Sequence, residues 1–212
     1  MKILLIAGPA SSTLDQARVI TNRSSGRTGV IVAGILKKHN LSPILWLGKG
    51  ATAPLPAELS ASARFGTVQE LETLLAADLS SFKAILLPAA LPDYRLKRAT
   101  GLDGKELDPH KWPGSLPKIH LELVPGPRIL PTLRAKAPQA KIVGWKWEAD
   151  GSLEELMTTA RRQIRDCQTD ACVLNGPAYG VGYLLIPACG EPVRCSDAAE
   201  LGHALVRFLQ EG

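Results

Sequence analysis

The most informative stretch of the sequence is Ile20-Thr21-Asn22-Arg23-Ser24-Ser25-Gly26-Arg27-Thr28-Gly29, which combines hydroxyl, amide, guanidinium and glycine residues. Ahead of it, Lys2–Ala7 is an apolar run typical of a buried strand, and behind it Val30–Leu36 has the composition of a helix packed on a sheet. Backbone N–H groups at such a helix start can bind an anion. The same residues could serve local structure alone, with Ser24 and Ser25 capping the helix and Gly26 allowing a tight turn.

Outside this stretch, short apolar runs alternate with helical patterns. The runs predict strands at 43–47, 84–87, 141–145, 171–174, 183–187 and 192–195. Helices are expected at about 68–77, at 153–167, where Ser152 and Glu155 resemble a capping box, and from Ser196 through Phe208. This alternation is typical of an α/β domain with a mostly parallel sheet that helices cover on both faces.

Two segments interrupt the alternation. Residues 52–60 are rich in proline and alanine, and residues 96–117 carry charges, glycines and prolines, so both are predicted to be loops. The following Lys118–Val124 alternates like a half-exposed strand that pairs outside the main sheet. We therefore expect one domain over residues 1–212 with a flap or dimerisation arm at about 96–124.

The amino-acid composition indicates which class of ligand the protein binds. The 25 Lys and Arg residues exceed the 20 Asp and Glu residues by five, and aromatic residues make up only 5%. This balance suits phosphorylated small molecules and does not indicate a nucleic-acid surface. The first apolar run is too short for a signal peptide or a membrane span, so we expect a cytoplasmic protein without membrane contact. The four cysteines lack a Cys-x-x-Cys pair, which predicts reduced thiols and no metal-binding side chains.

In open α/β sheets, ligands bind beyond the carboxyl ends of the strands. Here the segments after the predicted strands are Gly8–Arg18, Pro88–Arg95, Trp145–Glu148 and Asn175. Gly8–Gly29 matches the pattern Gly-Pro/Gly-Thr-x-x-x-x-Asp-x-x-Arg-x-Ile-Ser/Thr-Asn-Arg/His-Ser-Ser-Gly-Lys-x-Gly, with alanine for the threonine and arginine for the lysine. This pattern, an Ala-Ala-x-x-Asp-Tyr segment at 89–94 and a Trp-Lys-x-Glu segment at 145–148 together resemble the phosphopantothenate–cysteine ligase family, a domain of the DNA/pantothenate metabolism flavoproteins.

The resemblance implies a Rossmann-like three-layer domain that forms a homodimer through its arm. It also implies ligation of 4'-phosphopantothenate and L-cysteine through an acyl-nucleotide, with Mg²⁺ and a nucleoside triphosphate. CTP is favoured and ATP is possible. The chain begins at the ligase-like first strand, so no flavin and a separate decarboxylase are expected.

The matched motif positions imply residue roles. Asn22 would hold the carboxylate and the acyl intermediate, Arg18 would neutralise developing charge, and Lys111 would be the flap lysine, with Lys105 and Lys118 as alternatives. Phosphate would be bound by Ser24, Ser25, Gly26, Ala89 and Ala90. The nucleotide would be contacted by Gly8, Asp93, Pro127, Arg128, Ile129, Leu130, Trp145 and Lys146.

Simpler structural roles remain open for three of these residues. Asn22 could satisfy its own backbone in a turn, Arg18 could pair with Asp15 in a surface ion pair, and Asp93 could cap a turn.

Two further segments depart from the family pattern. Gly126-Pro127-Arg128 replaces the usual Asn-Pro-Asp, and Gln163 and Cys167 replace two lysines that reach the nucleotide. Arg161, Arg162 and Arg165 point elsewhere around the same helix. The alternative function is therefore a diverged, non-catalytic dimer that binds a nucleotide or a phosphopantetheine-like ligand. An NAD-dependent oxidoreductase is disfavoured because no Gly-x-Gly-x-x-Gly follows the first strand.

Overall fold

The computed structural model describes residues 1–108 and 110–211, so Pro109, part of the predicted flap, and Gly212 lie outside the described residues. The main sheet contains β1 (Lys2–Ala7), β4 (Ser42–Gly48), β5 (Ala61–Phe65), β6 (Ala84–Leu87), β9 (Lys141–Trp147), β10 (Ala171–Asn175), β11 (Tyr183–Pro187) and β12 (Val193–Cys195). Their order is β12-β11-β10-β9-β6-β1-β4-β5. Neighbours from β5 to β10 are parallel, whereas β10–β11 and β11–β12 are antiparallel. The parallel part has the Rossmann strand order, which confirms the predicted fold class.

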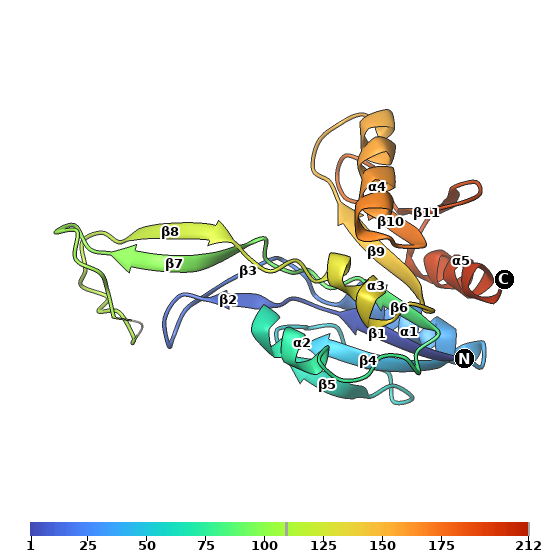
Figure 1. The fold of residues 1–212 in the computed structure, drawn as a ribbon, viewed down its shortest axis with the longest axis horizontal. Coiled ribbons are helices and arrows are strands. Elements are labelled where there is room, and N and C mark those ends of the chain that lie inside the picture. The colour runs from blue at the N-terminus through green and yellow to red at the C-terminus, as the bar shows by residue number, and fades with distance from the viewer. Residues whose placement is uncertain (109, 212) are drawn as a thin grey trace.

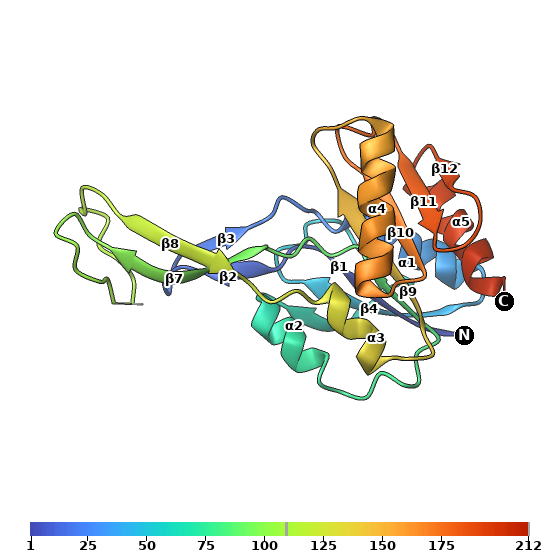
Figure 2. The same cartoon turned by 45° about the horizontal axis from the view of Figure 1, so that its top comes forward.

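Helices cover both faces of this sheet (Figures 1 and 2). On one face, α1 (Arg27–Lys38) and α5 (Ala198–Gln210) share a buried apolar cluster with alternate residues of the strands. On the other face lie α2 (Val68–Leu74), the short 3-10 helix η1 (Leu130–Thr132) and α3 (Leu133–Lys136), while α4 (Leu153–Cys167) covers β10 and β11. The domain therefore has the three layers that the sequence predicted.

Local sequence explains where the helices begin. α4 starts at the predicted capping box, because Ser152 Oγ accepts from Glu155 N–H at 3.4 Å and the Glu155 carboxylate accepts from Ser152 N–H at 2.8 Å. α2 ends at Leu74, earlier than predicted. α1 has Gly26 at its N-cap with a φ of 78°, so the N-cap residue itself offers no side chain. The first N–H of the helix, that of Arg27, instead donates to Ser25 Oγ at 3.3 Å, which agrees with the capping role considered for Ser25.

The arm is a two-stranded antiparallel sheet that extends away from the domain (Figure 1). It consists of β7 (Tyr94–Thr100) and β8 (His120–Pro125), so the predicted pairing outside the main sheet is confirmed. The prediction of a loop throughout 96–117 is wrong up to Thr100. β7 lacks an apolar alternation because it pairs outside the core, and its Lys97 and Arg98 contact Glu122 at 2.7 and 2.6 Å.

Three further strands and the short helices η1 and α3 were not predicted. Of the strands, β2 (Ser11–Thr13) and β3 (Val19–Thr21) form a short hairpin beside β7, and β5 forms the edge of the main sheet. Strands of three residues are too short to show a period, which explains why the hairpin was missed. The predicted loop at 52–60 contains no helix or strand. Among the described residues, no helix has the length and apolar character needed to cross a membrane.

Candidate ligand site at the sheet switch point

The strand order reverses between β1 and β6, and the loops after these two strands are hydrogen bonded to each other. Ala90 N–H donates to Gly8 O at 3.0 Å, and Ala10 N–H donates to Ala90 O at 3.1 Å. Asn22 Nδ2 donates to Leu91 O at 2.9 Å. The structure therefore brings Asn22 together with the predicted Ala89-Ala90 segment at the place where α/β sheets bind ligands. The alternative in which Asn22 satisfies only its own turn is wrong.

The Ser-Ser-Gly turn lies directly over the ends of β1 and β4. A Cβ on Gly26 would lie 3.2 Å from the Ala51 Cβ and 3.4 Å from the Gly8 Cα. Gly8 and Gly26 both have positive φ values, 82° and 78°, which favour glycine. Gly26 N–H points to Ser24 Oγ at 3.4 Å. The turn thus places hydroxyls and backbone N–H groups at the start of α1, an arrangement that suits an anion.

Arg18 and Lys111 lie elsewhere, at the outer end of the arm and hairpin. Arg18 pairs with Asp15, as in the alternative interpretation, but the Asp15 side chain is fully buried, so this is no surface ion pair. Lys111 is exposed. Arg18 and Asn22 lie four positions apart along extended chain, which corresponds to roughly 13 Å between their Cα atoms. Within one chain, these three predicted catalytic residues are not brought together.

The predicted nucleotide-binding residues around Asp93 form a second group. Gly126 N–H donates to Asp93 O at 2.8 Å, which places Pro127 beside the loop after β6. The Ile129 side chain is buried in the core and can offer a ligand only its backbone. Leu130 packs against Gly144, where a Cβ would lie 2.7 Å from Leu130 Cδ2.

Two cations of this second group lie on the α4 face of the sheet. Burial raises the pKa of the Cys167 thiol, and the nearby Arg128 guanidinium opposes this shift. Lys146 pairs with Glu148 at 3.3 Å. Burial raises the pKa of the Cys172 thiol to about 12, and the nearby Lys146 charge opposes this shift. Arg128 therefore lies near the position where the family carries a lysine.

Gln163 occupies the other α4 position at which the family pattern has a lysine. Its amide Nε2 lies 3.4 Å from both Trp145 O and Cys172 Sγ. Arg161, Arg162 and Arg165 are exposed, as their helical positions predicted.

Trp145 is separated from these cations. Its side chain packs on the opposite face, against the α1 and α5 cluster, and its indole Nε1 is buried without a hydrogen-bond partner among the described residues. The fold therefore does not place Trp145 beside Arg128 and Lys146, with which it was grouped.

The described residues contain no disulfide and no cluster of metal-binding side chains. The four cysteines are free, as predicted. Across residues 1–108 and 110–211, no three His, Cys, Asp or Glu side chains are grouped to hold a metal ion.

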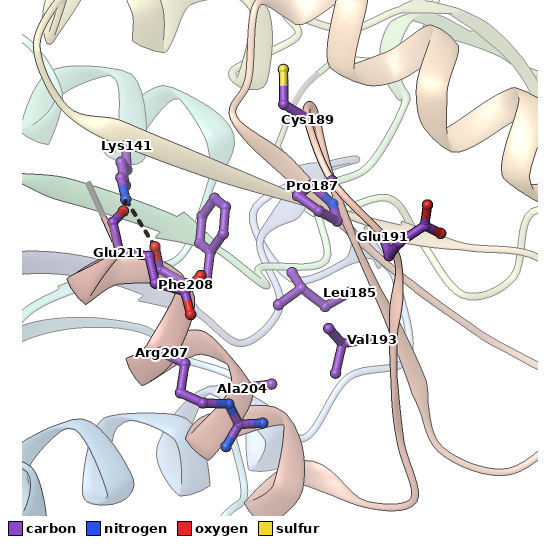
Figure 3. Close-up of a pocket in the computed structure, with 11 residues that line it drawn as sticks. Lys141, Leu185, Pro187, Cys189, Glu191, Val193, Ala204, Arg207, Phe208 and Glu211 are labelled. Atoms are coloured by element: carbon purple, nitrogen blue, oxygen red, sulfur yellow. Dashed lines mark hydrogen bonds between the residues drawn. The ribbon is translucent and has the colours of Figure 1, made fainter.

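Two pockets flank the antiparallel end of the sheet. One, of about 460 Å³, lies between the start of α1 and the start of α5 and includes Arg27, Thr28 and Asn175. The other, of about 350 Å³, lies among β11, β12 and α5 (Figure 3). In this pocket, Lys141 Nζ donates to Phe208 O at 2.8 Å and to Glu211 O. The lysine therefore satisfies carbonyl oxygens at the C-terminal end of α5. This pocket lies away from the loops after the parallel strands.

The fold and the joined loops define a Rossmann-like domain with a ligand site at its switch point. The chain belongs to the family of the DNA/pantothenate metabolism flavoprotein C-terminal domain, whose model matches residues 1–182.

Known relatives agree with this assignment. The bifunctional coenzyme A biosynthesis protein CoaBC of Thermococcus kodakarensis is 30% identical over 176 residues, which cover 82% of this chain and 41% of that protein. The chain thus spans about two fifths of that relative's length. The crystal structure of the DNA/pantothenate metabolism flavoprotein from Streptococcus pneumoniae has a TM-score of 0.87 at 21% identity, covering 99% of this chain and 98% of that one. A Cab2 variant in complex with phosphopantothenate-cysteine has a TM-score of 0.74 at 17% identity, covering 99% and 86%.

The sequence reasoning missed the contact between one residue of the β2–β3 hairpin and one of the loop between β7 and β8. Asp15 and Trp112 are both buried and hydrogen bonded to each other. Asp15 was noticed only as a partner of Arg18. A tryptophan inside a predicted loop was the available signal for Trp112, because large apolar side chains in exposed loops are often buried against something.

Proposed function

We propose that the chain catalyses nucleotide-dependent ligation of 4'-phosphopantothenate and L-cysteine to 4'-phosphopantothenoyl-L-cysteine. The observation that carries this proposal is the joining of the Asn22 loop to the Ala89-Ala90 loop at the switch point, in a chain of this family. CTP is the nucleotide we favour, and ATP is the alternative.

The reaction proceeds in two displacements. A carboxylate oxygen of phosphopantothenate attacks the α-phosphorus of the nucleotide, and pyrophosphate leaves. The amine of cysteine then attacks the acyl carbon and loses a proton, and the nucleoside monophosphate leaves. Neither step requires a protein nucleophile, so orientation and charge neutralisation can supply the catalysis.

Asn22 suits a role in orienting the reactants. Its Nδ2 is held by Leu91 O, while its Oδ1 has no hydrogen-bond partner among the described residues and the side chain is exposed. A fixed carbonyl oxygen can accept a hydrogen bond from the attacking amine. Beside it, Ser24, Ser25 and the N–H groups at the start of α1 would bind phosphate.

Mg²⁺ would be bound mainly by phosphate oxygens of the nucleotide, because Mg²⁺ prefers oxygen ligands and keeps few protein ones. It would neutralise negative charge on the triphosphate. Of the residues in this region, Asp93 is an exposed carboxylate that could add one ligand.

A homodimer would complete the site. Arg18 belongs to the turn of the β2–β3 hairpin and Lys111 to the loop between β7 and β8. The hairpin and the arm both extend away from the sheet (Figure 1), so in a two-fold dimer each could reach the partner's switch point. The exposed apolar side chains of the arm, Tyr94, Leu121 and Leu123, would be covered there. This dimer is consistent with the expectation from the family motifs.

The test is pyrophosphate release by the purified chain with Mg²⁺, 4'-phosphopantothenate, L-cysteine and either CTP or ATP. We expect release with one of the nucleotides and formation of the amide product. A folded chain that binds phosphopantothenate but releases no pyrophosphate would contradict the proposal. That outcome would favour the non-catalytic alternative, for which Gln163 and the buried Cys167 are the supporting observation.

A further inference from the structure

The buried carboxylate of Asp15 first organises the turn of the β2–β3 hairpin. Its side chain is fully buried, and its hydrogen-bond partner Trp112, which is also buried, belongs to none of the three apolar clusters of the domain. Asp15 Oδ1 accepts from Ala17 N–H and Arg18 N–H, both at 2.7 Å. A carboxylate that accepts from backbone two and three residues ahead stabilises a tight turn.

The second carboxylate oxygen joins this turn to the distant flap segment. Asp15 Oδ2 accepts from Trp112 N–H at 3.0 Å and from the Arg18 guanidinium. The two terminal nitrogens of Arg18 also lie 3.3 Å from Trp112 O. Asp15, Arg18 and Trp112 therefore form a closed ring of hydrogen bonds between two segments of the chain.

Further contacts hold the flap segment in place on either side of Lys111. The Trp112 side chain is buried, and its Nε1 donates to Asp108 O at 2.8 Å. Gln16 Nε2 lies 2.9 Å from His110 Nδ1. Lys111 is thus held against the hairpin by both of its neighbours in the chain, while its own side chain is exposed.

Arg18 keeps part of its guanidinium available. The side chain is 41% exposed although its terminal nitrogens contact Asp15 and Trp112. A guanidinium has five N–H donors, so this one can bind a further anion while its orientation stays fixed by Asp15.

We propose that Asp15 is a positioning residue that holds Arg18 and the Lys111 segment as one unit, so that both cations reach the ligand in a fixed relation to each other. This inference rests on the proposed function. The Asp15 carboxylate bonds only groups of the hairpin turn and of the flap segment, so its loss should loosen these two segments and leave the apolar core of the domain intact. Orientation of the two cations is the function that the geometry supports.

Asp15→Asn tests the idea without changing side-chain size. One of the two oxygens becomes an NH₂ group, which would face the N–H donors of Arg18 or Trp112. We expect kcat to fall about 100-fold, the effect of misplacing a catalytic group by about 1 Å. The KM for the nucleotide should stay within about twofold, and the melting temperature within about 3 °C. Asp103→Asn, which alters an exposed carboxylate in the loop between β7 and β8, is the matched control.

A triple variant separates positioning from a general structural effect. If Asp15 acts only by positioning Arg18 and Lys111, then adding Asp15→Asn to the Arg18→Ala, Lys111→Ala variant should cause no further loss of kcat. A further loss of kcat in the triple variant would overturn the proposal.

A fluorescence measurement keeps the inference testable apart from catalysis. Acrylamide quenching of Trp112, taken as the difference from a Trp112→Phe background, should increase in Asp15→Asn and remain unchanged in Asp103→Asn. If the wild-type chain releases no pyrophosphate, the ligase proposal fails and the quenching result alone decides whether Asp15 fixes the flap. Unchanged quenching in Asp15→Asn would overturn the positioning role whatever the activity.

Discussion

Asn22 links two loops through a single amide, and its loss should separate catalysis from stability. Asn22→Ala removes the bond to Leu91 O and the exposed Oδ1. We expect amide formation to fall by at least about 100-fold, whereas the free energy of unfolding should fall by only about 1 kcal/mol, because the side chain is exposed. Product formation and urea unfolding measure the two effects. Gln69→Ala, an exposed amide on α2, is the control; wild-type turnover in Asn22→Ala would remove its assigned role.

Arg128 lies near Cys167, where the family carries a nucleotide-binding lysine. Arg128→Ala should therefore raise the KM for the nucleotide about tenfold, which corresponds to the loss of about 1.4 kcal/mol of binding free energy. Steady-state kinetics with varied nucleotide measure this. Arg161→Ala removes an equal charge from the exposed side of α4 and should leave the KM unchanged. Equal effects of the two variants would show that only the net charge matters.

In strong acid, protonation of the Asp15 carboxylate should release the segment around Trp112 from the β2–β3 hairpin. Burial alone would raise the pKa of Asp15, but hydrogen bonds from Trp112, Ala17 and Arg18 hold it at about 2, below the ordinary value of 3.8. Because the folded pKa is the lower one, the stabilisation is present above about pH 4 and is lost as the pH falls toward 2. Trp112 fluorescence between pH 5 and pH 2 measures this loss. In Asp15→Asn the same transition should be absent, and its persistence would contradict the assignment.

Packing between α1 and β1 gives the prediction at the level of elements. A Cβ on Gly29 would overlap the buried Ala7 side chain, whereas a Cβ on Gly34 of the same helix would meet only Leu59 Cδ1 at 4.0 Å. Gly29→Ala should therefore lower the free energy of unfolding by about 1–3 kcal/mol. Gly34→Ala should raise it by about 0.5–1 kcal/mol, because alanine favours a helix. Chemical denaturation of both variants measures these values, and equal stabilities would contradict the packing argument.

Elements with a local signal were predictable from the sequence, and elements that depend on distant pairing were not. Both ends of α4 were predicted correctly, and its start was marked by the capping pair Ser152 and Glu155, which lie only three positions apart. β7 was missed because its charged side chains are stabilised by β8, whose Glu122 lies far away in sequence.

The same distinction holds for the candidate site. The motif containing Asn22 predicted its loop, and the structure adds the bond to Leu91. The contact between Asp15 and Trp112 joins segments 97 residues apart, and no spacing rule predicts such a contact. The motifs also failed to show that Trp145 and Arg128 lie apart. Their separation depends on the face of the sheet that each side chain occupies, which the motifs do not specify.

At the scale of the whole molecule, the distance between Asn22 and the arm predicts complementation between inactive variants. If each site combines one chain's Asn22 with its partner's Arg18, a heterodimer of Asn22→Ala and Arg18→Ala has one intact site and one that lacks both residues. After subunit exchange of an equal mixture, about half of the dimers are mixed, so we expect about a quarter of wild-type activity. Light scattering checks the dimer. Activity no higher than that of the separate variants would contradict a shared site.

The packing of α5 on α1 also affects how the protein is made. Gly202 of α5 fits against Ile35 of α1, where an added Cβ would lie 2.9 Å from the Ile35 Cβ. The ribosome produces α1 early, but the helix that covers its apolar side follows every other element of the domain. Because the α1–α5 contact cannot form before α5 has been synthesised, a nascent chain keeps one side of α1 exposed until α5 emerges. Chaperone binding during synthesis should therefore concentrate on α1.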